Sequence, residues 1–306
     1  MITLRQMRYF DTLSNTLHFG RAARAANISQ PALSAQIMEM ENHLGVKLVE
    51  RSRSGVIITQ KGMEILQHAR AILAEVDQLE ATARKGSGVL EGPVRIGIIP
   101  TIAPYLVPQL IPRLRQTYPR IEIELKEAVT DRLRSDLLEG KLDAVIAALP
   151  LDDESLASQM LFTDRFYMAV ARNEDSVLSS PMTEAQVDMN RLLLLEEGHC
   201  LRDQALAVCG TAGKRSLVNF GATSMTTLLQ MVSHDMGMTL IPEIAVPLET
   251  KRNNLRIVAF AEPQPSRQIG LAWRRSSARA DDMSALAHMI TACASKETQA
   301  VGHVQD

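Results

Sequence analysis

The feature that most constrains the fold is a change of hydrophobic pattern at the glycine-containing stretch of residues 86–92. Before it, apolar residues recur mainly at helical intervals. After it, short apolar runs that are typical of buried strands alternate with helical segments. Domains usually have about 100–150 residues, so a 306-residue chain is long enough for more than one. We therefore expect a helical amino-terminal part followed by a larger α/β part.

Charge follows the same division. Residues 1–88 hold 11 Lys and Arg against 8 Asp and Glu, whereas the remaining residues hold 22 against 27. A basic segment attracts polyanions, so the amino-terminal part is the one expected to bind nucleic acid.

Targeting and membrane signals are not evident. Met1 to Tyr9 carry Arg5 and Arg8 and no apolar run. No window reaches the ~18 uninterrupted apolar residues that a membrane helix needs. Hydrophobic residues make up 46% and charged residues 22%, which is ordinary for a globular protein. We expect a cytoplasmic protein without a membrane partner.

The amino-terminal part carries a helix-turn-helix pattern. A segment of small residues, 20–26, is interrupted at Asn27-Ile28, and Ser29 then provides an N-cap with Pro31 in the first turn. This second helix is expected to run to about Leu44. Its apolar face leaves the polar leading end free to enter a major groove. The residues expected nearest the base edges are Gln30, Pro31 and Ser34.

A wing and a long helix follow. Residues 46–51 and 56–58 flank a turn at 53–55 and predict a hairpin, in which Arg51 and Arg53 would meet phosphates. The alternative is a small helical bundle that happens to carry surface arginines. Thr59 can cap a helix over 60–84 whose apolar stripe requires a partner helix, as in a dimer. The stripe consists of Ile65, Ala69, Ile72, Val76, Leu79 and Ala83.

The runs Phe19–Ile37, Leu44–Arg51 and Thr59–Gly62 together resemble the winged helix-turn-helix signature of LysR-type transcriptional regulators. The resemblance implies a DNA-binding domain at 1–59, a linker helix and hinge at 60–90, and a regulatory domain at 91–306. It also implies binding to double-stranded promoter DNA, assembly into a homodimer or homotetramer, and contact with RNA polymerase.

The carboxy-terminal part alternates strands and helices, which predicts a mostly parallel α/β sheet. The expected strands are 94–99, 121–126, 142–148, 238–241 and 268–273, and the expected helices are 104–118, 130–139, 225–234, 244–251 and 281–294. Ligands gather at the carboxyl ends of such strands, where Thr101 is expected. The family resemblance implies two α/β subdomains similar to a periplasmic binding protein, the second at roughly 163–267. By itself, this predicts a small-molecule effector in the cleft.

Cys200 gives a sharper signal. Gly198 ends one segment, and His199 to Val208 contains no helix breaker, so Cys200 is expected at a helix amino terminus. The helix dipole stabilises a thiolate there, and the thiolate is the form that attacks peroxide. On one helix, Cys200 and Cys209 would have α-carbons roughly 13 Å apart. A disulfide tolerates at most about 7 Å, so pairing would require refolding. The alternative is that both cysteines are small buried residues.

Residues 196–205, with 97–101, 222–224, 239–242 and 245–247, resemble the peroxide-responsive branch of the LysR-type family. This implies that Cys200 reacts with hydrogen peroxide and that Cys209 resolves it by a disulfide. It also implies that Thr101, Thr130 and His199 line the peroxide pocket.

The same resemblance puts Asp203 near this pocket and has Arg267 supporting the thiolate. Each assignment has an alternative. Thr101 and Thr130 could be helix caps, His199 a surface imidazole, Asp203 a solvated helix residue, and Arg267 part of an exposed turn. Cys293 is expected to be a core or interface residue.

The sequence contains no motif for nucleotide binding, nucleophilic hydrolysis or zinc binding. The sequence has no nucleotide-binding glycine loop, no nucleophile elbow, no zinc-protease helix and no paired zinc-ligand spacing. We expect no cofactor, no metal and no enzymatic turnover. Two alternatives to a peroxide-responsive regulator stay open: a regulator that responds to a metabolite, and a thiol peroxidase that uses the same two cysteines catalytically.

Overall fold

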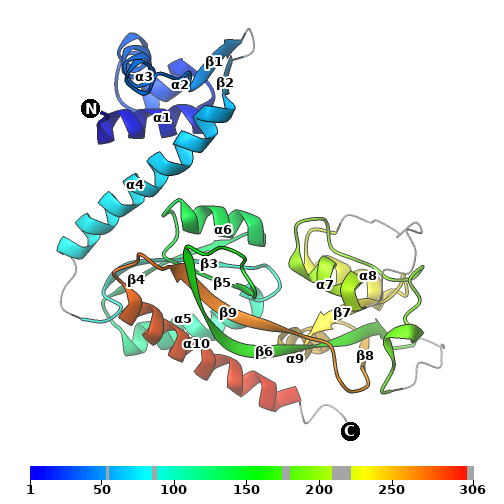
Figure 1. Ribbon diagram of the computed structural model, residues 1–306. Helices are drawn as coiled ribbons and strands as arrows, with labels where there is room; N and C mark the ends of the chain where they lie inside the picture. Colours follow the sequence, from blue (N-terminus) through cyan, green and yellow to red (C-terminus); the bar gives the residue numbers. More distant parts are fainter. Residues whose placement is uncertain (53–54, 85–87, 174–179, 209–221, 302–306) are drawn as a thin grey trace. The chain divides into compact units, whose positions relative to one another are not determined.

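The computed structural model describes residues 1–52, 55–84, 88–173, 180–208 and 222–301 (Figure 1). The chain divides into two units, Met1–Lys85 with Leu138–Lys141 and Gly86–Leu137 with Leu142–Asp306. Among the described helices, none is long and apolar enough to cross a bilayer.

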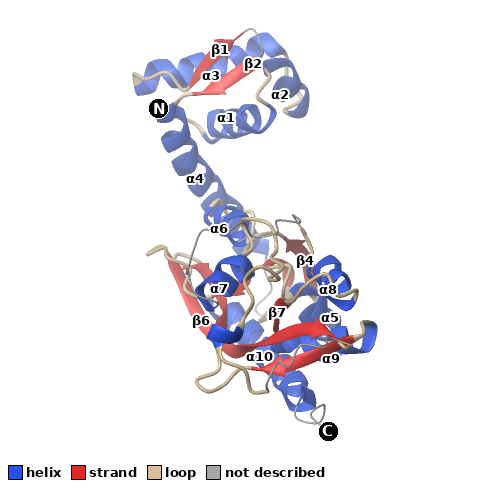
Figure 2. Cartoon of the chain, turned by 90° about the vertical axis from the view of Figure 1, so that its right-hand side faces the viewer, coloured by secondary structure: helices blue, strands red, loops and turns tan. Residues whose placement is uncertain are grey.

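Helices and a two-stranded hairpin form the first unit. Its elements are α1 (Leu4–Thr16), α2 (Phe19–Ala25), α3 (Gln30–Leu44), β1 (Val49–Ser52), β2 (Gly55–Ile58) and α4 (Gln60–Arg84). Phe10, Leu13, Leu33 and Ile37 meet in its core. Strands β1 and β2 pair antiparallel from Val49↔Ile58 onward. The predicted winged helix-turn-helix is confirmed, and the plain helical bundle is wrong because the hairpin forms (Figure 2).

The ends of α3 follow from its sequence. Ser29 Oγ accepts a hydrogen bond from the Ala32 N–H at 3.3 Å, which satisfies one of the free amides of the first turn. The helix ends at Gly45, whose φ of 69° lies in the left-handed region that glycine adopts without strain. The predicted helix over 30–44 is confirmed, and it exposes Gln30 and Pro31 at its leading end.

A buried carboxylate attaches α3 to the wing. Glu41 Oε1 accepts hydrogen bonds from the Leu48 N–H at 2.9 Å and the Val49 N–H at 3.2 Å, and Oε2 accepts from Lys47 Nζ at 2.7 Å. Burial would raise the pKa of Glu41, but the hydrogen bonds from Lys47, Leu48 and Val49 outweigh burial and lower this pKa below 4.5. The wing strand is thus held through a charged acceptor.

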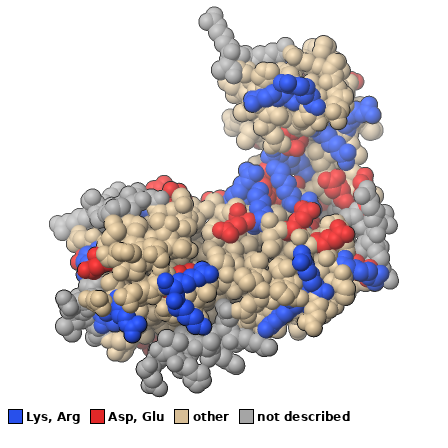
Figure 3. All heavy atoms as spheres, turned by 180° about the vertical axis from the view of Figure 1, so that it is seen from behind, with Lys and Arg blue, Asp and Glu red and all other residues tan. Residues whose placement is uncertain are grey.

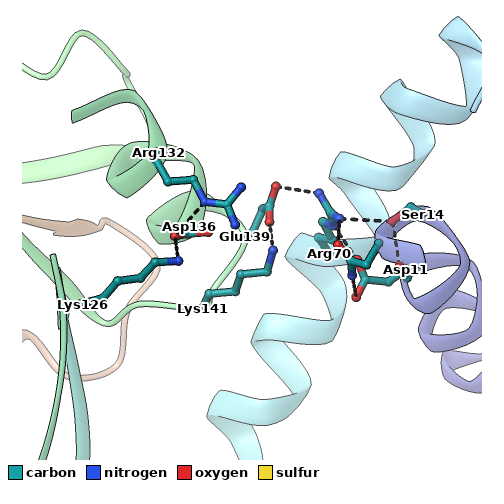
Figure 4. Close-up of polar contacts among 9 residues, drawn as sticks. Asp11, Ser14, Arg70, Lys126, Arg132, Asp136, Glu139 and Lys141 are labelled. Carbon is teal, nitrogen blue, oxygen red and sulfur yellow. Dashed lines mark hydrogen bonds and ion pairs between the residues drawn. The ribbon is translucent and has the colours of Figure 1, made fainter. Parts of the chain in front are cut away.

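An arginine on α4 connects it to α1. Arg70 Nε donates to Asp11 Oδ1 at 2.6 Å, and its Nη2 donates to Ser14 Oγ at 3.2 Å (Figure 4). Both acidic and basic side chains are largely shielded, with 16% of Arg70 and 26% of Asp11 exposed. This contact holds the first half of α4 against α1.

One curved sheet organises the second unit. Its order is β4 (Ile121–Glu127), β3 (Gly92–Ile98), β5 (Ala144–Ala148), β9 (Ser266–Arg274), β6 (Leu156–Ala171) and β7 (Thr239–Pro242), and β8 (Leu255–Ala259) also pairs with β6. Among the pairings between these seven strands, those of β3 with β4 and β5 are parallel, and those made by β9, β6, β7 and β8 are antiparallel. The prediction of a mostly parallel sheet is therefore wrong, because β6 and β9 form a long antiparallel pair.

Helices cover this sheet. They are α5 (Ala103–Thr117), α6 (Thr130–Leu138), α7 (Cys200–Val208), α8 (Met225–Ser233), α9 (Val246–Arg252) and α10 (Ala280–Val301), with short 3-10 turns at Glu184–Gln186 and Glu243–Ala245. Helix α10 packs on α5 and β6. Within α10, Met283, Leu286 and Ile290 are fully buried.

Strand β6 passes through two sheet regions. It pairs with β9 from Leu156↔Arg274 to Arg165↔Ser266, and its residues from Phe166 onward pair with β7 and β8. The two halves of the unit are thus joined by one continuous strand. The predicted second subdomain at roughly 163–267 has its ends at this crossing.

Replacing Glu41 with Ala should detach the wing from α3. The two backbone amides then lose a charged acceptor, and hydrogen bonds to charged groups contribute about 1.5–3 kcal/mol. We expect hydrogen exchange at the Leu48 and Val49 amides to accelerate by a corresponding amount. Glu39→Ala, at an exposed position of the same helix, is the control and should change neither amide. Unchanged protection in Glu41→Ala would show that the wing is held by other contacts.

Candidate functional site

The site lies where two parallel strands end. Because β3 and β4 are parallel neighbours, the chain leaves both strands at the same edge of the sheet. Thr101 follows β3, and Thr130 follows β4 as the first residue of α6. The start of α7 completes a small cavity at this edge. Its lining residues are Ile99, Pro100, Thr101, Val129, Thr130, His199 and Cys200.

Cys200 is the first residue of α7, and its side chain is partly exposed. Gly198 has a φ of 91°, a conformation in which a larger residue would be strained, and it turns the chain into the helix. Arg202 Nη1 donates to the Leu195 carbonyl at 2.9 Å and fixes the preceding segment. The thiol therefore lies at the amino-terminal end of α7, which is the positive end of the helix dipole.

His199 points inward. Its exposed fraction is 8%, so the alternative of a surface imidazole is wrong. Burial lowers the pKa of His199 below 6.5, and the charges of Glu196 and Glu127 only partly oppose this. At neutral pH the imidazole beside Cys200 is therefore uncharged, and it can act as a hydrogen-bonding group without adding a fixed positive charge.

Thr130 contributes a hydroxyl without a partner. Its Oγ1 is buried and has no hydrogen-bond partner among the described residues, so it does not cap α6. Burying an unpaired hydroxyl costs about 1–3 kcal/mol. An unpaired polar atom in a cavity wall beside a thiol is a group available to a polar ligand.

Thr101 is held by Arg267. Arg267 Nη1 donates to Thr101 Oγ1 at 2.9 Å, and its Nε and Nη2 donate to Asp164 Oδ2 at 3.0 and 2.8 Å. Arg267 lies in β9 and is 4% exposed, so the alternative of an exposed turn is wrong. Helix α5 has Ile102 at its N-cap without a side-chain hydrogen bond, so Thr101 is not its cap. Sequence reasoning missed Asp164, whose only signal is its register opposite Arg267.

Other predicted residues lie elsewhere. Asp203 is exposed on α7 and is not among the residues lining the cavity, so its place in the site stays a prediction. Cys209 lies outside the described residues. Cys293 is 1% exposed in α10, where Arg113 Nη1 donates to its Sγ at 3.4 Å, in agreement with the predicted core position.

The cavity suits a very small, polar reactant. The space between its lining residues does not admit a water-sized molecule in this conformation, so any reactant must enter with a side-chain movement. Among the described residues, no group of three or more His, Cys, Asp and Glu could hold a metal ion. The chemistry available is that of a partly exposed thiol with two neighbouring hydroxyls.

The candidate DNA-binding residues belong to the first unit. Gln30 and Pro31 are exposed at the start of α3, and Ser34 is partly exposed one turn later. Arg51 lies in β1, and Arg53 is outside the described residues. Figure 3 shows Lys and Arg side chains on the surface of this unit.

Comparison with protein families matches both units. Residues 4–63 match the bacterial regulatory helix-turn-helix protein, lysR family, and residues 87–294 match the LysR substrate binding domain. The DNA-binding transcriptional dual regulator OxyR of Escherichia coli is 40% identical over 291 residues, which cover 95% of each chain.

Solved structures show the same similarity. A full-length OxyR variant from Pseudomonas aeruginosa matches with a TM-score of 0.75 and 33% identity, over 96% of this chain and 99% of that one. A cysteine-to-serine OxyR variant from Corynebacterium glutamicum, with H2O2 bound, matches with a TM-score of 0.63 and 32% identity. That match covers 99% of this chain and 97% of the other.

Acid should destabilise the second unit through His199. Because its pKa is lowered in the folded state, the proton binds the unfolded chain more tightly, and stability falls as pH drops below 6.5 toward the lowered value. The loss amounts to about 1.4 kcal/mol for each unit of lowering. We expect His199→Gln to lack this loss in urea titrations followed by Trp273 fluorescence. Exposed His288→Gln is the control and should keep it; the same loss in both variants would contradict the assignment.

Proposed function

The chain belongs to the LysR family of transcriptional regulators, and from this premise we propose that it is a DNA-binding regulator switched by hydrogen peroxide at Cys200. The observation that supports the proposal is the partly exposed thiol at the start of α7, which lines a small cavity. The unpaired Thr130 hydroxyl and the arginine-bound Thr101 hydroxyl line the same cavity. The similarity to OxyR over nearly the whole chain adds independent support.

Size favours peroxide over a metabolite at this cavity. H2O2 is close to water in size and carries both donors and acceptors for two hydroxyls. Both reactants require the cavity walls to move, because no water-sized space exists in this conformation, and a metabolite requires a much larger movement. The metabolite alternative makes a distinct prediction, namely that a response to the metabolite persists when Cys200 is replaced by Ser.

The proposed chemistry has two steps. The Cys200 thiolate attacks one oxygen of H2O2, the S–O bond forms while the O–O bond breaks, and the other oxygen leaves as hydroxide into the solvent. The resulting sulfenic acid then reacts with the Cys209 thiol, forming the disulfide and releasing water. Cys209 follows Val208, the last residue of α7, so the second step requires part of α7 to unwind.

We propose that the first unit binds DNA and so carries the regulatory response. We assign Gln30, Pro31 and Ser34 to base edges in the major groove and Arg51 and Arg53 to phosphates. Apolar side chains on α4 are exposed, Ile72 to 43% and Leu79 to 70%, and they favour pairing with a second copy of the helix. A homodimer or homotetramer would present two recognition helices to a two-fold operator, with RNA polymerase as a further partner.

We propose that the protein is a cytoplasmic peroxide sensor and that it does not consume peroxide catalytically. A thiol peroxidase would also use Cys200, but it would leave the winged helix-turn-helix without a role. Steady-state consumption of peroxide with a thiol reductant separates the two. A sensor consumes about one equivalent per switching event, whereas a peroxidase consumes many.

Peroxide should change the footprint of the protein on its own promoter. Wild-type protein is expected to give different protected regions and different transcription before and after one equivalent of H2O2. Cys200→Ser is expected to give the reduced footprint in both conditions, because no S–O bond forms. Cys293→Ser, which alters a buried thiol of α10, is the control and should respond as wild type. Identical footprints and transcription in both states of the wild type would refute the proposal.

Thr130→Val should stabilise the protein while slowing its oxidation. Valine has nearly the same shape and removes an unpaired buried hydroxyl, so we expect the free energy of unfolding to rise by about 1 kcal/mol. Loss of a donor to the peroxide should slow Cys200 oxidation by about 10-fold or more in stopped-flow measurements.

Thr250→Val is the matched control for Thr130→Val. Thr250 Oγ1 donates to the Val246 carbonyl at 2.7 Å in α9, so its removal should lower stability slightly and leave the oxidation rate unchanged. An oxidation rate in Thr130→Val equal to that of the wild type would remove Thr130 from the reactive site.

A further inference from the structure

Asp164 and Arg267 face each other on paired strands. They are register partners in β6 and β9, and the side chain of each is 1% exposed. Arg267 uses Nε and Nη2 on the same carboxylate oxygen, Asp164 Oδ2. These two hydrogen bonds hold one edge of the Arg267 guanidinium. They fix both its position and its rotation about the long axis of the side chain.

Further contacts fix Asp164 itself. Its other oxygen, Oδ1, accepts a hydrogen bond from the Ile244 N–H at 3.1 Å, in the 3-10 turn that follows β7. On the other side, Arg267 Cζ lies 5.7 Å from the centre of the Phe166 ring. The carboxylate thus has both oxygens engaged, and the guanidinium has little freedom to turn.

This arrangement determines what Thr101 can do. With one edge of Arg267 on Asp164, Nη1 donates to Thr101 Oγ1, and Nη2 also approaches the Thr101 carbonyl at 3.4 Å. A threonine hydroxyl has a single proton and two lone pairs. Because its oxygen accepts from Arg267, its own O–H must donate elsewhere. Among the described residues no acceptor for that proton is present, and Thr101 lines the cavity of Cys200.

We propose that Asp164 is a positioning residue for Cys200 oxidation, which acts by holding Arg267 so that the Thr101 hydroxyl donates into the cavity. The inference rests on the proposed function and adds a residue to it. When the thiolate attacks H2O2, negative charge develops on the departing oxygen. A hydrogen bond from Thr101, strengthened because its oxygen accepts from a cation, stabilises that charge. Arg267 then acts through Thr101, without needing direct contact with the sulfur.

Asp164→Asn is the first test variant. The amide that this substitution introduces lacks the negative charge that holds the Arg267 guanidinium. The guanidinium then becomes more mobile, and the Thr101 O–H is no longer oriented toward the cavity. We expect the second-order rate constant with H2O2 to fall by about 10-fold, less than the 100-fold or more that removal of a donor costs. Alkylation of Cys200 by iodoacetamide forms a C–S bond and releases iodide, which needs no such donor. Its rate should therefore stay near that of the wild type.

A purely structural role predicts a different pattern. If Asp164 only keeps the unit folded, peroxide oxidation and alkylation should slow together or not at all. Either result would overturn the inference. A wild-type protein whose Cys200 does not react with H2O2 would instead refute the proposed function.

A double-mutant cycle with Thr101→Val tests the route through Thr101. Thr101→Val alone should slow peroxide oxidation. Adding Asp164→Asn should then cause no further slowing, because the group it directs is absent. Equal and independent effects of the two substitutions would show that Asp164 does not act through Thr101.

Asp164→Glu keeps the inference testable if Asp164→Asn does not fold. It preserves the buried ion pair, so the unit should remain folded, but the additional methylene displaces the carboxylate. A structural role predicts wild-type oxidation in this variant, whereas positioning predicts a slower reaction with H2O2 and unchanged alkylation. Full-length protein is used in every arm, with Trp273 fluorescence as the check on folding.

Discussion

The buried ion pair between Asp164 and Arg267 is the contact on which the second unit depends. It lies where β6 passes from its pairing with β9 to its pairing with β7 and β8. Desolvating two charges is costly, and attraction compensates only when the geometry is good and the remaining polar atoms are satisfied. Here Ile244 and Thr101 satisfy them. The same contacts therefore join the two sheet regions and fix the position of the Thr101 hydroxyl, which lines the same cavity as Cys200.

Two features of the site lower local stability, and the rest of the second unit offsets this loss. Thr130 Oγ1 is buried without a hydrogen-bond partner among the described residues, and His199 is buried with a lowered pKa. Each feature alone would be unfavourable in an ordinary core. They occur together at the edge of a sheet in which β5 is wholly buried and Ile96, Gly97 and Ile98 of β3 are buried. A rigid sheet thus tolerates a cavity wall that is prepared for a polar reactant.

Much of this fold could be predicted from adjacent residues in the sequence. The pairing of the strands could not, because it depends on residues far apart in the chain. Ser29 and Gly45 set the ends of α3 because capping depends on a few adjacent residues. Strand β5 was recognised because burial on both faces leaves a continuous apolar run, and β3 was recognised because only Arg95 interrupts its apolar residues from Val94 onward. Strand β6 was missed because Gln159, Thr163 and Arg165 interrupt its apolar pattern. Nor could the direction of its pairing be predicted, since it depends on β9, about 100 residues away. The same separation hides Asp164, which has meaning only opposite Arg267.

Helix α7 is short and carries the candidate thiol at its start. Its nine residues are fewer than an isolated helix needs to be stable in water, so its stability comes from packing. Only Leu201 and Ala205 of this helix are buried. Few contacts must therefore break when its last turn unwinds, although its first residue remains tied to the cavity. A disulfide from Cys200 to Cys209 would supply the constraint that keeps the helix unwound. The shortness of α7 is thus as much a part of the proposed sensor as the thiol at its start.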